Sequence, residues 1–330
     1  MGFRGYACAT ALALLASGAA GAEDGSVDQA RDALAKKDGD ADSSKALEEV
    51  FQASEKSYTL LKKGERQLTY GLDYSMMKDT RIQQVKTGDS VYSVLATSEA
   101  QHTFTNSFTF DYGIWDNLTF SLRLPFVAKY DTERDIHAYS LGDISATLRW
   151  QPWASVRGRP VTTLYATLGL PTGDSPFDMN PDDDVSTGNG YYSLGVGANV
   201  SYVIDPVVLF GSAGYTYNNK VDSIHQTQYG QELQKVVPGD TLNFSMGMAY
   251  ALSYDVSLAT SYQMKSRYHF ADQSVESAAQ TSAIMNFSLG LRTSPDYIVN
   301  INAGFGLTED SPDVLLGVSL PLDIKGLKPQ

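Results

Sequence analysis

The residues of this chain that could do chemistry are few and scattered. The four histidines, His102, His137, His225 and His269, lie far apart, and none is followed three to five positions later by the second His or Cys of a metal-binding motif. A catalytic serine needs a histidine base beside it, and Ser274 with His269, in one polar stretch, is the candidate pair that the sequence offers. Serine is frequent in this chain, so the spacing favours solvated loop histidines over a lipid-hydrolysing site.

An acidic run follows Pro181. Asp182, Asp183 and Asp184 could hold Ca²⁺ through clustered carboxylates, but the ligand spacing of an EF-hand is missing. A solvated acidic loop is the better interpretation. We therefore expect no catalytic residues, no bound metal and no cofactor, and we expect the protein not to be an enzyme.

Charged residues of both signs recur on the polar side of strand-like segments, where they would either line an aqueous path or pair across it. We expect eight of them to line a pore: Asp73, Asp111, Arg123, Lys129, Asp143, Arg149, Lys265 and Arg267.

The segments that must position these charges alternate with period two. In residues 192–202 every second residue is apolar, from Tyr192 to Tyr202, and the residues between are Ser, Gly or Asn. The Asp205-Pro206 turn follows, and residues 207–217 carry an apolar face back. This length and alternation are typical of transmembrane β-strands, although one hairpin of a soluble sandwich would look the same.

Repetition separates these two interpretations. Twelve such faces follow one another after Gly64, near residues 68–76, 104–112, 118–126, 144–150, 164–170, 192–202, 207–217, 242–250, 252–264, 285–291, 297–307 and 314–320. Short turns alternate with longer polar loops, and Trp115, Trp150 and Trp153 lie at or beside the short turns. This regularity predicts an all-β fold, a 12-stranded antiparallel transmembrane β-barrel with short turns in the periplasm.

The N-terminus predicts export. Residues 1–22 have an early Arg4, an apolar stretch and Ala20-Gly21-Ala22, as a signal peptide cleaved after Ala22 has. The single cysteine, Cys8, lies inside this segment. Cleavage leaves 24 basic against 38 acidic side chains, a formal charge of −14, which argues against nucleic acid as a partner. We expect the outer membrane, with its lipid and lipopolysaccharide, as the location.

Residues 23–64 differ from the rest and are expected to form a short periplasmic helical segment before the barrel of residues 65–330. A helix should run from about Ser43 to Lys63. We call the apolar stripe along it the seam; it consists of Leu47, Phe51, Tyr58 and Leu61. Two heptads are fewer than a confident coiled coil needs. The seam could therefore act as a gate that plugs the lumen, pair in a homotrimer, or dock a periplasmic partner.

Four stretches carry a family resemblance: LLKKGERQLTYGLDY from Leu60, GDI from Gly142, LGLPTGD from Leu168, and the Asp205-Pro206 turn. They resemble the outer-membrane transporter family named for the meta-cleavage pathway of phenol degradation. That family is similar to the secretion channel of bacterial functional-amyloid systems. The resemblance implies transport and covers Leu60 to the C-terminus, but the short helical segment and the non-aromatic C-terminus depart from it.

The function predicted is an outer-membrane pore that passes a solute or an unfolded polypeptide by diffusion, gated by the N-terminal helix. Two alternatives stay open: an outer-membrane enzyme acting on lipid, and a structural or adhesive barrel with a closed lumen.

Overall fold

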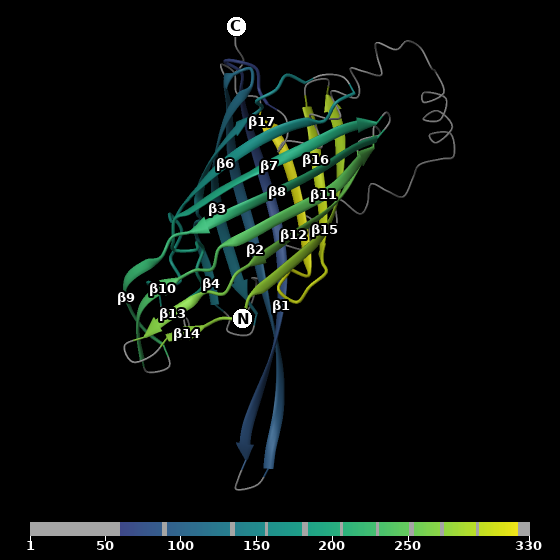
Figure 1. Cartoon of the computed structure of the whole chain (residues 1–330). Coiled ribbons are helices and arrows are strands. Elements are labelled where there is room, and N and C mark those ends of the chain that lie inside the picture. The colour runs from purple at the N-terminus through teal and green to yellow at the C-terminus, as the bar shows by residue number, and fades with distance from the viewer. Residues whose placement is uncertain are drawn as a thin grey trace, which may run out of the picture. The chain divides into compact units, whose positions relative to one another are not determined.

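The computed structural model describes residues 60–87, 91–132, 136–155, 158–179, 184–204, 207–228, 231–250, 254–270, 274–294 and 297–322. Every regular element among them is a β-strand (Figure 1). None of these residues belongs to a helix long and apolar enough to cross a membrane.

Twelve of the described strands close into one antiparallel barrel, which confirms the predicted fold class and strand number. The barrel strands are β1 (Arg66–Thr87), β2 (Val91–Trp115), β3 (Leu118–Asp131), β5 (Ile144–Trp150), β6 (Val161–Leu170), β7 (Ser193–Ile204), β8 (Val207–Asn218), β11 (Thr241–Tyr250), β12 (Tyr254–Gln263), β15 (Gln280–Ser294), β16 (Tyr297–Gly306) and β17 (Val314–Leu322). Pairing of β1 with β17 and of β2 with β3 closes the ring, so the wall has no free edge.

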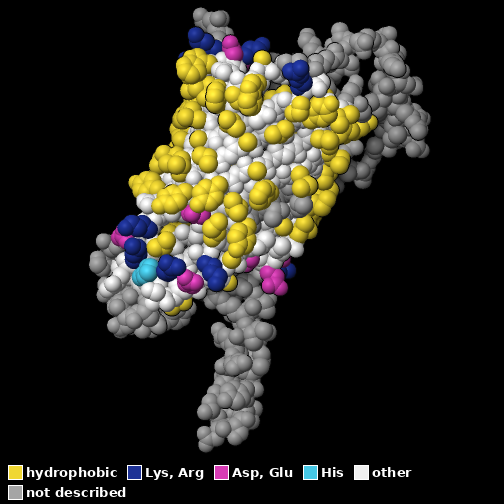
Figure 2. Space-filling view, viewed as in Figure 1, with side chains coloured by type: hydrophobic (Ala, Val, Ile, Leu, Met, Phe, Trp, Pro, Cys, Tyr) yellow, Lys and Arg dark blue, Asp and Glu magenta, His cyan; other side chains and the backbone are white. Residues whose placement is uncertain are grey.

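Alternation along each strand sorts side chains between the two faces of the wall. On β7, Leu194 and Val196 are exposed on the outside, whereas Gly195, Asn199 and Ser201 on the opposite face are buried. Figure 2 shows the result as a broad apolar band over the barrel strands, with charged side chains gathered towards its ends. Such a band is what a lipid bilayer requires of a barrel surface.

The three tryptophans lie at the end of the barrel that carries the short turns. Trp115 ends β2, Trp150 ends β5, and Trp153 follows in the turn to β6; all three side chains are exposed. Their positions fit an interfacial aromatic girdle.

The other end of the barrel is more elaborate than the sequence suggested. The polar stretches expected as loops contain β4 (Ile136–Leu141), which extends the pairing of β3, and a separate four-stranded sheet. That sheet consists of β9 (Val221–Gln228), β10 (Gln231–Val237), β13 (Arg267–Phe270) and β14 (Ser274–Glu276). It has its own small core of Ile224, Leu233 and Val236, with Phe177 and Tyr268 packed against it.

β1 and β2 also continue past the barrel wall as one hairpin. Their register runs unbroken from Arg66–Tyr112 to Thr87–Val91, so the expected loop of residues 78–100 is mostly paired strand. Only the first part of this ladder belongs to the barrel wall, because β1 pairs with β17 as far as Met76.

The segment before β1 is not helical where it is described. Residues 60–62 have no regular structure, and Lys63 and Gly64 form a turn in which Gly64 has φ of +83°. The expectation of a helix reaching Lys63 is therefore wrong for these last residues, because their backbone groups bond to the barrel instead. The backbone N–H of Leu61 donates to the Thr119 hydroxyl at 2.9 Å, and that of Gly64 donates to the Gly113 carbonyl at 2.8 Å.

Candidate functional site in the barrel lumen

The inner face of the barrel encloses two polar cavities, of about 550 and 510 Å³. The first is lined from nine strands and the second from seven, and between them every one of the twelve barrel strands contributes. Ten of the seventeen residues that line the first cavity are serine or threonine. Hydroxyls from neighbouring strands pair across this surface, such as Thr147 with Thr167 at 3.0 Å and Ser212 with Ser245 at 2.6 Å.

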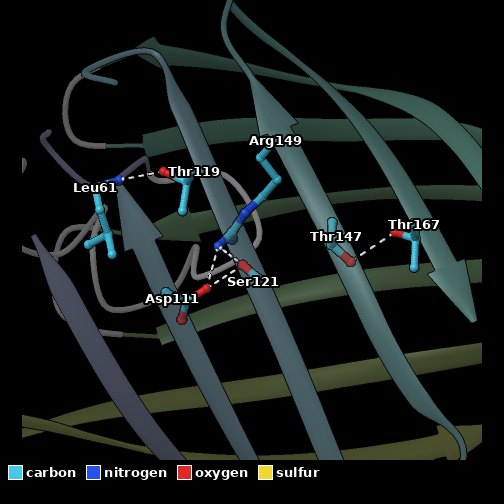
Figure 3. A network of polar contacts seen from close by, with 7 residues as sticks. All are labelled: Leu61, Asp111, Thr119, Ser121, Thr147, Arg149 and Thr167. Carbon is cyan, nitrogen blue, oxygen red and sulfur yellow. Dashed lines mark hydrogen bonds and ion pairs between the residues drawn. The ribbon is translucent and has the colours of Figure 1, made fainter. Parts of the chain in front are cut away.

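A buried ion pair lies against the wall of the first cavity (Figure 3). Arg149 on β5 places Nη2 at 2.7 Å from Asp111 Oδ1 and donates to the Ser121 hydroxyl at the same distance. Ser121 in turn donates to the Asp111 carboxylate. The two charged side chains are only 11% and 12% exposed, so this cluster joins β2, β3 and β5 rather than filling the open lumen.

A second pair of opposite charges is far more open. Arg123 on β3 lies 3.7 Å from the Asp73 carboxylate on β1, with the two side chains 46% and 51% exposed. These two residues line both cavities, and no other residue in the described part of the chain lines both.

Two predicted pore residues lie at the rim instead. Lys129 is near the end of β3, in the part that pairs with β4. Asp143 lies in the break between β4 and β5, where its carboxylate accepts the backbone N–H groups of Gly173 and Asn189 at 3.1 and 2.7 Å. Asp143 thus ties the loop after β6 to the barrel, and neither residue lines the two cavities.

The expected inner-face positions of Lys265 and Arg267 are wrong. β12 ends at Gln263, so both residues lie beyond the barrel wall, and Arg267 belongs to β13 of the separate sheet. Arg267 pairs with Glu276 across the β13–β14 hairpin at 2.8 Å, and that hydrogen bond lowers the pKa of the Glu276 carboxyl. The error arose because the sequence alternation of β12 continues past the point where the strand leaves the barrel.

Of the four seam residues expected in a gate helix, only Leu61 lies within the described residues. Leu47, Phe51 and Tyr58 lie outside them. Leu61 bonds to Thr119, a fully buried residue on the inner face of β3 (Figure 3). A side chain on Gly113, also on the inner face, would run into the Lys62 carbonyl. The segment therefore lies against the inner face of β2 and β3 at the short-turn end of the barrel.

Sequence reasoning missed two aromatic side chains in the lumen. The Tyr165 ring on β6 lies over Gly197 and Gly214, and the Phe210 ring on β8 lies over Gly247, within 2.6 Å of where a Cβ would be. Gly197, Gly214 and Gly247 therefore make room for aromatic side chains of the wall itself. The signal was present in the sequence, because Tyr165 and Phe210 interrupt the small polar residues on the inner face of their strands.

The pair of residues considered for catalysis does come together. His269 Nδ1 lies 2.8 Å from the Ser274 hydroxyl, because the two residues are directly opposite on β13 and β14. Within the described ranges, no carboxylate is bonded to the other ring nitrogen of His269, and no three His, Cys, Asp or Glu side chains gather as a metal site. The contact is accounted for by cross-strand pairing at an exposed hairpin.

Solved structures resemble this fold. An outer membrane channel from Pseudomonas putida F1 matches with a TM-score of 0.60 at 12% identity, over 81% of this chain and 97% of that chain. The translocator domain of the autotransporter NalP from Neisseria meningitidis matches at 0.45 and 11% identity, over 86% of this chain and 98% of that one. The first match supports the outer-membrane barrel fold, and the second is too distant to add to it.

A family model described as "Putative MetA-pathway of phenol degradation" matches residues 78–323, about three quarters of the chain. The match covers the eleven barrel strands from β2 to β17 and leaves out the part of β1 that belongs to the barrel wall. It agrees with the apolar outer band, the closed ring of strands and the barrel fold of the outer membrane. The chain therefore belongs to the family of outer-membrane β-barrels described as the putative MetA-pathway of phenol degradation.

Proposed function

We propose that this protein is a passive channel of the outer membrane that carries a small hydrogen-bonding solute through the barrel lumen. The observation that carries the proposal is the polar lining contributed by all twelve strands inside a wall that is apolar outside. A closed structural barrel would fill its interior with packed side chains, as barrels of about eight strands do. Resemblance to an outer membrane channel from Pseudomonas putida F1 supports the same interpretation.

The lumen favours a small solute over an unfolded polypeptide as cargo. The two cavities, of about 550 and 510 Å³, are within the size range of small-molecule sites, roughly 300–1,000 Å³. The Asp73–Arg123 pair lines both cavities, so an extended chain would also meet its two charges. The family description points to the degradation of phenol, and phenols are small solutes with one hydroxyl group.

Liposome swelling tests the channel. Vesicles that contain the folded protein should swell at rates that fall with the size of an added uncharged solute, from glycerol through pentoses to disaccharides. Empty vesicles, and vesicles with heat-denatured protein, provide the controls. Swelling no faster than in empty vesicles would reject the channel in favour of a closed barrel or an enzyme that acts on lipid.

We further propose that the region before the barrel controls access to the lumen from the periplasmic side. Support comes from Leu61, the last residue of the predicted seam, which is bonded inside the barrel mouth to Thr119. Lys63 is held in the same place, since its N–H donates to the Asp116 carboxylate at 2.9 Å. The predicted gate segment directly precedes these residues in the sequence, and its Leu47, Phe51 and Tyr58 would supply the apolar face that occludes the mouth.

Deletion of residues 23–59 tests the gate and leaves the anchor in place. The shortened protein should show a several-fold higher open probability in planar bilayers. A variant in which a Gly/Ser linker of equal length replaces the segment should behave in the same way. If both variants match the full chain, the segment does not gate the channel and serves as a docking handle.

A further inference from the structure

The Asp73–Arg123 pair occupies a special position in the lumen. Among the described residues, these two are the ones that line both cavities, so they lie where the two cavities adjoin. Both side chains are on the inner face, and each keeps about half of its surface exposed. The pair is therefore accessible to whatever occupies the lumen.

The other lumen pair provides a contrast within the same barrel. Asp111 and Arg149 have the same charges, but they are buried and Ser121 bonds to both. Their charges are largely withdrawn from the lumen. At 3.7 Å and half exposed, Asp73 and Arg123 form a loose, hydrated pair of the kind that contributes little to stability.

An exposed pair of opposite charges acts differently on different solutes. A cation is attracted by Asp73 and repelled by Arg123, and for an anion the signs are reversed, so the pair gives neither ion a net attraction that would offset the loss of its hydration. An uncharged solute with a dipole meets no net repulsion and can orient between the two charges. Next to the pair, the second cavity offers the amide groups of Asn286 and Asn302 and the hydroxyl of Ser288 as further hydrogen-bonding partners.

Resting on the channel function proposed above, we propose that Asp73 and Arg123 form a charge-compensated selectivity site that passes uncharged, hydroxyl-bearing solutes in preference to ions of either sign. This pair acts where the two cavities adjoin. Removing one charge unbalances the site and should admit ions of one sign.

The variants Asp73→Asn and Arg123→Gln test this, with ion selectivity measured from reversal potentials in planar bilayers under a salt gradient. Relative to the unmodified channel, Arg123→Gln should shift the cation-to-anion permeability ratio several-fold towards cations, and Asp73→Asn several-fold towards anions. The double variant should return close to the original ratio, because the charge difference is again zero.

Matched controls make the same change of charge away from the junction. Lys265→Gln and Asp178→Asn alter exposed residues outside the barrel strands and should move the ratio much less than the lumen variants. Liposome swelling adds a second readout, since the single variants should speed the entry of organic ions of one sign relative to an uncharged sugar.

Two results would overturn the inference in different ways. A conducting protein whose single variants keep the original reversal potential would remove the pair from the permeation path and leave the channel function intact. An unmodified protein that passes neither ions nor sugars would reject the channel, and the selectivity site with it.

Discussion

The position of the Tyr165 ring affects the width of the lumen. Its ring lies over Gly197 and Gly214, and a Cβ on either glycine would overlap its hydroxyl group. Aromatic side chains that cover glycines on a neighbouring strand shield the exposed backbone there. The pair of glycines therefore lets the ring lie along the wall instead of across the channel.

The variant Gly214→Ala should push the Tyr165 ring into the lumen and lower single-channel conductance. Adding Tyr165→Phe should restore most of that conductance, because the hydroxyl is the atom that overlaps, and the next ring carbon is 3.3 Å from the place that the alanine Cβ would take. Gly211→Ala provides the control, since its nearest neighbour is a carbonyl oxygen at 3.4 Å. Equal conductance in Gly214→Ala and the unmodified protein would show that Tyr165 does not limit the path.

The buried pair should matter for stability more than for transport. Asp111→Asn leaves the Arg149 guanidinium without its carboxylate partner, and breaking a buried ion pair in this way costs roughly 3–5 kcal/mol. The double variant Asp111→Asn with Arg149→Gln should lose clearly less, because neither member of the pair is then charged. Unfolding in urea, followed by the gel mobility of the folded barrel, measures both. A double variant less stable than the single one would contradict this explanation.

At the scale of elements, the anchor at residues 60–65 behaves as part of the barrel. The Gly113 N–H donates to the Glu65 carbonyl, in addition to the bond from the Gly64 N–H to the Gly113 carbonyl. The Lys62 N–H donates to the Glu65 carboxylate at 2.9 Å. Gly113 is required for this contact, because a Cβ there would also be 2.8 Å from the Leu61 carbonyl oxygen. Backbone atoms cannot move aside as easily as the tip of a side chain.

Gly113→Ala should therefore release the anchor without unfolding the barrel. Trypsin should then cleave after Lys62 and Lys63 several-fold faster in the variant than in the unmodified protein. The gel mobility of the folded barrel serves as the control for intact folding. Cleavage at the original rate would mean that the segment is held by contacts other than those at Gly113.

The twelve barrel strands could be predicted because lipid outside and water inside impose an alternating pattern on each of them. The five other strands could not, because β4, β9, β10, β13 and β14 do not show a lipid-facing stripe. The contacts within the two ion pairs of the lumen could not be predicted from the sequence either. Asp73 and Arg123 are on strands separated by β2, so their contact depends on side-chain direction and barrel curvature as well as on alternation.

Lys265 and Arg267 show what the alternation of apolar and polar residues cannot predict. A period of two reports which face of a strand a residue occupies, but it does not report where the barrel wall ends. Tyr165 could have been noticed, because a large aromatic side chain on an otherwise small and polar face needs room from its neighbours.

For the whole molecule, the central claim is that solute passes through the inside of the barrel. Two adjacent residues of β6 face opposite sides of the barrel wall: Thr167 lines the first cavity, and Leu168 is exposed on the outer face. The single natural cysteine, Cys8, is in the predicted signal peptide, so an introduced cysteine would be the only one in the processed protein.

The most direct test is single-channel recording from Thr167→Cys and Leu168→Cys during addition of a bulky, water-soluble methanethiosulfonate reagent. If solute passes through the lumen, the conductance of Thr167→Cys should fall in a discrete step when the reagent reacts, because the added group occupies the path. Leu168→Cys and the unmodified protein should keep their conductance. A Thr167→Cys channel that reacts with the reagent and conducts as before would contradict permeation through the lumen.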